Sequence, residues 1–151
     1  MKFEKVTISY EYKRFGAMLY LLQKNNRKYL NDELAKHNIN LLQAMILLIL
    51  NDIENATQKD LADIMYLTKS GITKAINNLE KQGYIKKEKS PKDGRSFVLK
   101  LSEKGQKILP TINQINDEWE EKIGVSELSD EFKDTIEELT YKSIQLNYES
   151  E

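Results

Sequence analysis

Apolar residues recur at helical spacing along most of this chain, which predicts a largely helical protein. The range 10–36 carries one apolar stripe and no proline, so we expect a long amphipathic first helix there. Asn40 can cap the next helix, and Gln43 stands where a capping-box partner belongs. The range 41–50 is apolar almost all round, which predicts that this helix lies at the buried centre of the fold.

The middle of the chain has the pattern of two short helices joined by a turn. Thr57 can cap the first helix, and Thr68 can cap the second, which we expect over 69–82. Gly83 is a suitable residue to end it. One side of this second helix is apolar and is predicted to be buried: Ile72, Ala75, Ile76 and Leu79. Two helices in this order outline a helix-turn-helix.

Two strand-like segments follow the second helix directly. The ranges 84–89 and 97–101 flank Asp93-Gly94, a residue pair typical of tight hairpin turns. A helix-turn-helix followed by a two-stranded hairpin describes a winged helix. The expected fold class is therefore mainly α with a small β-hairpin.

The C-terminal third is predicted to be helical again. Ser102 can cap a fifth helix, in which Pro110 should cause a kink or an early end, and Gly124 should end it. A last helix is expected to begin at Ser126 or Ser129. The winged helix-turn-helix is thus expected to be embedded between helices contributed by both ends of the chain.

Composition excludes several classes of protein. A chain of 151 residues with 40% apolar side chains can form one domain, or two small lobes that share a core. The absence of cysteine excludes disulfides, thiolate catalysis, Cys-based redox sensing and Cys-ligated zinc. The longest apolar run, 44–50, is far shorter than the roughly 20 residues needed to cross a bilayer. With no apolar signal segment after the N-terminus, we expect a cytoplasmic protein without a membrane partner.

Charge is distributed unevenly along the chain although the formal net charge is only −1. The range 57–104 has 11 Lys and Arg against 6 Asp and Glu, whereas the range 105–151 has 4 against 12. A basic segment beside an acidic one suggests an anionic partner for the basic segment. The alternative is that these charges only cover solvated helix faces.

Few residues could perform catalysis. The chain has one histidine, His37, and lacks both a phosphate-binding glycine loop and a nucleophile-elbow pattern. We therefore expect no enzymatic activity, no cofactor and no metal site. A protein that buffers a metal ion or small ligand stays open as an alternative.

The second helix of the helix-turn-helix carries hydrogen-bonding side chains on its outward side. No carboxylate occurs on that side before Glu80. Lys can contact guanine edges, Asn can pair with adenine, and Ser or Thr can serve several bases, while a helix N-terminus suits a phosphate. Asn78 and Lys81 lie on the same side. The candidate DNA-binding residues of this helix are Thr68, Lys69, Ser70, Thr73, Lys74 and Asn77. The alternative is an ordinary surface helix rich in Lys and Asn.

The hairpin carries six cationic side chains within fifteen residues. Arg95 places a guanidinium on a narrow loop that can enter a minor groove, and Asp93 can hold that guanidinium through a charge-assisted hydrogen bond. The candidate DNA-binding residues of the wing are Lys89, Lys92, Asp93 and Arg95. The alternative is a solvated hairpin whose lysines protect an exposed edge strand from wrong pairing.

One motif resembles a known family. Asp93-Gly-Arg95, followed after five residues by Leu101-Ser-Glu-Lys-Gly105, is similar to the wing signature of the MarR family of bacterial transcriptional regulators. The segment from Leu79 to Ile85 also resembles the end of that family's recognition helix, and the order of elements fits over about residues 10–147. Gly71 departs from a good helix pattern, because glycine costs up to about 1 kcal/mol relative to alanine.

The resemblance implies a homodimer made of two kinds of lobe. Residues 1–38 and 105–151 would form a helical dimerisation lobe, and residues 39–104 would form the winged helix-turn-helix DNA-binding lobe. Apolar stripes on the terminal helices give an independent reason for dimerisation. A two-fold dimer would place two reading helices about 34 Å apart, one turn of DNA.

The same resemblance implies the function. Two winged helices would bind double-stranded DNA at a pseudo-palindromic operator, with Arg95 in the minor groove, Asp93 orienting it, and the 69–77 face in the major groove. We expect a sequence-specific repressor. Because family members often release DNA when a small aromatic molecule binds, such an effector is a candidate partner, with no site residues assigned. The alternative is a winged-helix protein–protein interaction module without DNA binding.

Overall fold

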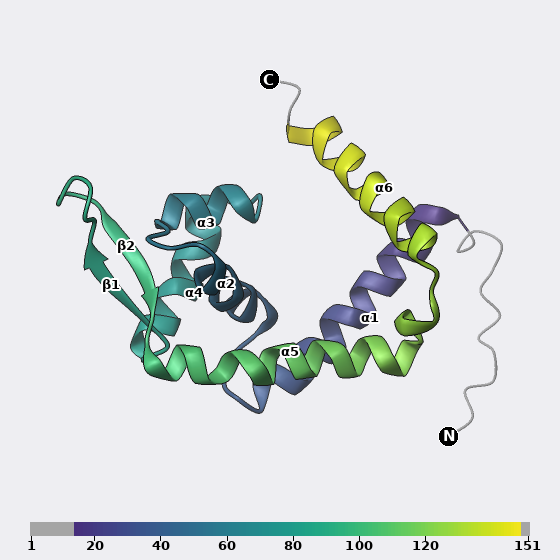
Figure 1. The fold of residues 1–151 in the computed structure, drawn as a ribbon, viewed down its shortest axis with the longest axis horizontal. Helices are drawn as coiled ribbons and strands as arrows, with labels where there is room; N and C mark the ends of the chain where they lie inside the picture. Colours follow the sequence, from purple (N-terminus) through teal and green to yellow (C-terminus); the bar gives the residue numbers. More distant parts are fainter. Residues whose placement is uncertain (1–13, 149–151) are drawn as a thin grey trace. The chain divides into compact units, whose positions relative to one another are not determined.

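The computed structural model describes residues 14–148 and contains six α-helices, one short 3-10 helix and one β-hairpin in that range (Figure 1). The elements are α1 (Phe15–Ala35), α2 (Leu41–Asp52), α3 (Gln58–Ile64), α4 (Lys69–Lys81), β1 (Ile85–Lys89), β2 (Phe97–Leu101), α5 (Glu103–Ile123), η2 (Val125–Glu127) and α6 (Asp130–Tyr148). The predicted class, mainly α with a small hairpin in a winged helix-turn-helix, is confirmed. Residues 10–13 of the expected first helix lie outside the described range.

The chain forms two compact units, Met1–Asn116 and Asp117–Glu151. The first contains the complete winged helix-turn-helix together with α1 and the first part of α5. The second contains the end of α5, η2 and α6. The two lobes expected from the sequence differ in what they bind, one a second copy of the chain and the other DNA. A division into compact units does not test that difference, so the two lobes stay a prediction.

Local side-chain caps fix where α2 and α3 begin. At α2, Asn40 Oδ1 accepts the Gln43 N–H and Gln43 Oε1 accepts the Asn40 N–H, both at 2.9 Å. At α3, Thr57 Oγ1 accepts the Asp60 N–H at 3.1 Å, and Asp60 Oδ2 accepts the Thr57 N–H at 2.7 Å. The bonds from Thr57 hold the pKa of Asp60 below its ordinary value. Both predicted N-caps are therefore confirmed.

The core of the first unit gathers around α2, as its all-round apolar sequence predicts. Ile46 and Leu47 are fully buried, and α2 packs against α1, α4 and β2. The whole predicted inner side of α4 is buried: Ile72, Ala75, Ile76 and Leu79. This burial fixes which side of α4 faces outward.

The hairpin is joined to the core at its base. The strands pair antiparallel with Ile85 opposite Leu101 and Lys89 opposite Phe97. The Leu99 N–H also donates to the Ala56 carbonyl at 2.8 Å, which connects β2 to the loop between α2 and α3. In Figure 1 the loop between β1 and β2 projects away from α3 and α4 as a free arm.

A serine and a glycine connect the hairpin to α5. The Ser102 hydroxyl shares its single proton between the carbonyls of Gly83 and Tyr84, at 2.5 and 3.0 Å, and its oxygen accepts the Gly105 N–H at 3.0 Å. A Cβ on Gly105 would lie 2.1 Å from the Tyr84 oxygen, so only glycine fits there. The last residues of the wing signature are therefore needed for a close backbone approach, and the predicted Ser102 cap is confirmed.

The predicted early end of α5 at Pro110 is wrong, because the helix continues to Ile123. Proline removes one hydrogen-bond donor, but the apolar side of the helix stays buried before and after it, which holds the helix together. The buried residues on this side are Ile108, Leu109, Ile112 and Ile115. Gly124, at φ +81°, then ends α5, as predicted. Of the two candidate starts for α6, Ser129 is the cap, since its Oγ accepts the Phe132 N–H at 3.2 Å.

Candidate nucleic-acid interface

The outward side of α4 presents the predicted polar side chains. Thr68 caps the helix by accepting the Gly71 N–H at 3.2 Å, and its hydroxyl lies 3.1 Å from that of Ser70. Gly71 is thus in the first turn, where its low helix propensity matters less than in the middle of the helix. Five of the six candidates are exposed and Thr73 is half-buried: Thr68, Lys69, Ser70, Thr73, Lys74 and Asn77.

Two glutamines from other helices hold the two edges of this outward side. From α3, Gln58 Nε2 donates to Thr73 Oγ1 at 2.5 Å. From α2, the buried Gln43 donates through Nε2 to Asn78 Oδ1 at 2.7 Å. Gln82 donates to the same Asn78 oxygen and to the Asn38 carbonyl. These bonds oppose rotation of α4 about its own axis and keep one face directed outward.

Sequence reasoning placed Gln43 in the capping box of α2 but did not identify the contact of either glutamine with α4. Gln43 is 35 residues from its partner and Gln58 is 15 residues from its partner, so no helical spacing connects either pair. The sequence pattern also placed Asn78 among the outward donors. Asn78 is exposed, but its amide oxygen accepts the hydrogen bond from Gln43 of α2.

Asn77 is oriented by the hairpin. Its Oδ1 accepts a hydrogen bond from Lys87 Nζ at 3.2 Å, and the same ammonium pairs with Glu80 at 2.9 Å. Within the described part of the chain, no protein group accepts from the amide N–H groups of Asn77. These groups are free to bind base acceptors.

The tip of the hairpin is ordered by its own residues. Asp93 Oδ1 accepts the backbone N–H groups of Arg95 and Ser96, each at 3.0 Å, and the Ser96 hydroxyl at 2.9 Å. Gly94 takes φ +62°, a turn conformation that suits glycine. The bonds from Ser96 and then Arg95 keep the pKa of Asp93 below its ordinary value, so Asp93 is ionised at neutral pH.

The expected bond between Asp93 and the Arg95 guanidinium is replaced by these backbone bonds. A short Asp side chain reaches N–H groups two and three residues ahead, and such bonds do not require a long Arg side chain to be ordered. Asp93 therefore orients Arg95 through the backbone of the turn.

Ion pairs neutralise some hairpin cations but leave the candidate cations unpaired. Lys100 pairs with Glu88 at 2.9 Å, which raises the pKa of Lys100, and Lys87 pairs with Glu80. Among residues 14–148, no ion pair involves the exposed candidate cations: Lys69, Lys74, Lys89, Lys92 and Arg95. Their positive charge is available to phosphates.

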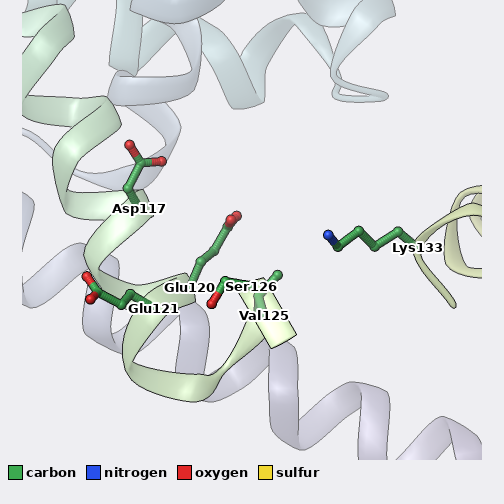
Figure 2. Close-up of a pocket in the computed structure, with 6 residues that line it drawn as sticks. All are labelled: Asp117, Glu120, Glu121, Val125, Ser126 and Lys133. Carbon is green, nitrogen blue, oxygen red and sulfur yellow. The ribbon is translucent and has the colours of Figure 1, made fainter. Parts of the chain in front are cut away.

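Two cavities lie away from this surface. In the second unit, a cavity of about 590 Å³ is lined by Asp117, Glu120, Glu121 and Lys133, with Lys133 reaching from α6 toward the space between them (Figure 2). Its acidic lining is unsuited to a nucleic acid. In the first unit, a cavity of about 370 Å³ lies between α1, α2 and the start of α5. Most residues around this second cavity are apolar, among them Leu30, Leu34, Leu48 and Ile112.

The described residues contain no cluster of three or more His, Cys, Asp or Glu placed to hold a metal ion. Within the same range, no helix is both long and apolar enough to cross a bilayer.

The family model described as MarR family matches residues 37–96, a range that begins just after α1 and includes both candidate surfaces. The HTH-type transcriptional regulator BilQ of Clostridioides difficile is 28% identical over 142 residues, covering 93% of this chain and 96% of that protein. The chain is similar to the MarR family over residues 37–96. The resemblance carried by the wing signature is thereby confirmed.

Other known proteins resemble this chain over most of its length. The HTH-type transcriptional regulator SarZ of Staphylococcus haemolyticus is 27% identical over 79% of this chain and 81% of its own. A MarR transcriptional regulator from Methanosarcina mazei Go1 has a TM-score of 0.77 at 25% identity, covering 87% of this chain and 96% of that one. The S. aureus MepR–DNA complex, at 22% identity, shows the same fold with a TM-score of 0.79 over 91% of this chain and 98% of that one.

Proposed function

We propose that this protein is a sequence-specific DNA-binding repressor in the cytoplasm, with no enzymatic role, that acts as a homodimer on a pseudo-palindromic operator. The observation that carries the proposal is the pairing of two surfaces. One is the outward side of α4, which is held at both edges. The other is a hairpin tip whose exposed cations have no ion-pair partners among the described residues. The relatives named as transcriptional regulators support it.

The two surfaces have different roles in the proposal. α4 would lie in the major groove, with Lys69, Ser70, Thr73, Lys74 and Asn77 near the bases and Thr68 near a phosphate. On the wing, Arg95 would enter the minor groove, held by the turn that Asp93 orders, and Lys89 and Lys92 would contact phosphates. Because these contacts release counterions, affinity would fall steeply with salt.

Exposed apolar side chains on the terminal helices support the homodimer. On α1, Phe15, Leu19 and Leu22 are 53%, 43% and 51% exposed, and on α6, Phe132 and Leu146 are 48% and 77% exposed. Large apolar side chains gathered on one element are costly in water. A second copy of the chain would bury them through the proposed dimerisation lobe, residues 1–38 and 105–151.

The cavity between α1, α2 and α5 supports release by a small effector. Its volume of about 370 Å³ and its mostly apolar lining suit a small aromatic molecule. Such a molecule would contact both α2, which holds α4 through Gln43, and helices of the proposed dimerisation lobe. We assign the effector role to this cavity.

The test is to select bound duplexes from a random pool with the purified full chain, and then to measure affinity for the selected duplex over a range of salt. Arg95→Ala should weaken binding and reduce the slope of log K against log salt by about one unit. Lys28→Ala on α1 removes the same charge from an exposed residue outside the wing and serves as the control.

If the chain selects no duplex even at low salt, the proposal fails and the interaction-module alternative takes its place. If Arg95→Ala behaves like the Lys28 control at every salt concentration, the wing assignment is wrong.

A further inference from the structure

The hydroxyl of Thr73 is already used by the protein. Thr73 Oγ1 accepts the Gln58 Nε2–H at 2.5 Å and donates its single proton to the Lys69 carbonyl at 2.6 Å. A threonine hydroxyl has one donor, so Thr73 has none left for an acceptor on a base edge. Of the candidate DNA-binding residues on α4, it is the one that is half-buried.

The geometry of this side chain directs its methyl group away from the hydroxyl. Because Cβ is tetrahedral, the γ-methyl diverges from Oγ1, which faces α3 and the preceding turn. Two hydrogen bonds also hold χ1, which is stiff in a β-branched residue, in one rotamer. The methyl is therefore presented as a fixed apolar group beside the outward side of α4.

We propose that Thr73 is a specificity-determining residue that selects thymine through its γ-methyl, and that Gln58 is the positioning residue that holds it. This inference rests on the proposed DNA binding. Thymine is the base that carries an apolar group, its C5-methyl, in the major groove, and a threonine methyl is one of the groups that contacts it. Ser70, which lacks a methyl, cannot make this contact.

The competing role for Thr73 uses its oxygen. The second lone pair of Oγ1 could accept a hydrogen bond from adenine N6 or cytosine N4. Two substitutions distinguish a contact made by the hydroxyl oxygen from one made by the methyl group. Thr73→Val keeps a methyl and removes the hydroxyl, whereas Thr73→Ser does the reverse.

The experiment begins with the duplex that the full-length chain selects from a random pool. Each thymine is then replaced in turn by deoxyuridine, which removes only the C5-methyl, and affinity is measured by fluorescence anisotropy. For the wild-type chain, one replacement per half-site should weaken binding about fourfold, the value of one buried methylene-sized group. Thr73→Ser should bind the thymine and uracil duplexes equally at that position. Thr73→Val should keep the difference, because valine in a helix strongly prefers one χ1 rotamer and so holds its methyl groups without the Gln58 bond.

Gln58→Ala tests the positioning role. It should reduce the thymine-to-uracil ratio at the same position and leave the ratios at other thymines unchanged. A residue that only stabilised the fold would lower affinity for all duplexes alike. Circular dichroism and thermal unfolding of each variant confirm that the chain is folded.

Several results would overturn the inference. One is a Thr73→Ser variant that keeps the full thymine-to-uracil difference. Another is loss of binding in Thr73→Val with binding retained in Thr73→Ser, which would assign the role to the hydroxyl. A selected duplex in which no thymine methyl matters would overturn this inference but not the proposed function. A chain that selects no duplex would overturn both.

Discussion

Helix α4 and the tip of the β1–β2 hairpin are both exposed and cationic, but they are held in place by different means. α4 buries a complete side in the core and is bonded at its edges by Gln43 and Gln58 from two other helices. The hairpin tip is ordered by Asp93, which bonds residues two and three positions ahead.

This difference separates two requirements of a DNA-binding surface. A helix that selects bases must have a fixed position relative to the groove, and that position depends on the packing of the whole unit. A cationic arm needs a fixed local shape, and its own turn provides it. We therefore expect substitutions around α4 to change stability and binding together, and substitutions in the tip to change binding with little effect on stability.

The largest effect is expected in the core beneath α4. Ile76→Ala removes a fully buried side chain and should lower the free energy of unfolding by about 2–5 kcal/mol. Chemical denaturation measures this loss. Ile64→Ala removes the same atoms from a side chain that is 43% exposed and is the matched control. Equal losses in the two variants would contradict the assignment of Ile76 to the core.

The next largest effect is expected where the hairpin joins α5. Gly105→Ala places a Cβ 2.1 Å from the Tyr84 carbonyl oxygen, so the backbone must shift, at a cost of about 3 kcal/mol. Gly16→Ala in the first turn of α1, where a Cβ meets nothing within 4 Å, should instead change stability by less than about 0.5 kcal/mol. Thermal unfolding compares the two, and similar melting temperatures would show that the close approach is not needed.

Two neighbouring asparagines on α4 should respond in opposite ways. Asn78→Ala leaves the buried Gln43 amide without an acceptor and should cost about 1–3 kcal/mol of stability. Asn77→Ala removes an exposed contact to Lys87, so it should change stability by less than about 0.5 kcal/mol but relax preference at one or two base pairs.

Unfolding and duplex selection on both variants test this pair. If Asn77→Ala lowered affinity for all sequences alike, a role in base selection would be excluded. If Asn78→Ala were as stable as wild type, the Gln43 bond would not hold the helix.

The smallest effect is expected from acid at the hairpin tip. The pKa of Asp93 is lowered in the folded protein, so its contribution is complete above the ordinary Asp value of about 3.9 and is lost as pH falls through the lower folded value. The amide NMR signals of Arg95 and Ser96 should therefore titrate with a midpoint below 3.9, and Asp93→Asn should remove this transition. A midpoint at or above 3.9 would contradict the turn geometry.

Much of the fold follows from the sequence because its determinants are local. The Asn40–Gln43 and Thr57–Asp60 capping boxes join residues three apart, and helical spacing alone identified the buried side of α4. The hairpin follows from a turn pair between two short strands. In each case the partners are close in the chain, so a pattern of a few residues is sufficient.

Other features were decided by contacts between distant segments. The sequence shows that Asn78 and Thr73 are polar and outward, but not that Gln43 and Gln58 use their oxygens, because those partners are 35 and 15 residues away. It marks Gly105 as part of a motif, but the reason, the Tyr84 carbonyl against its Cα, exists only once β1 and α5 meet.

The sequence by itself determined the elements, their caps, the buried side of α4 and the cationic hairpin. The tertiary structure decided which hydrogen-bonding atoms of the surface remain available, including the free amide of Asn77 and the occupied hydroxyl of Thr73. The physical reason is that the residue type fixes which donors and acceptors a side chain has. Whether each of them is free or already bonded depends on which groups the packing brings within about 3 Å.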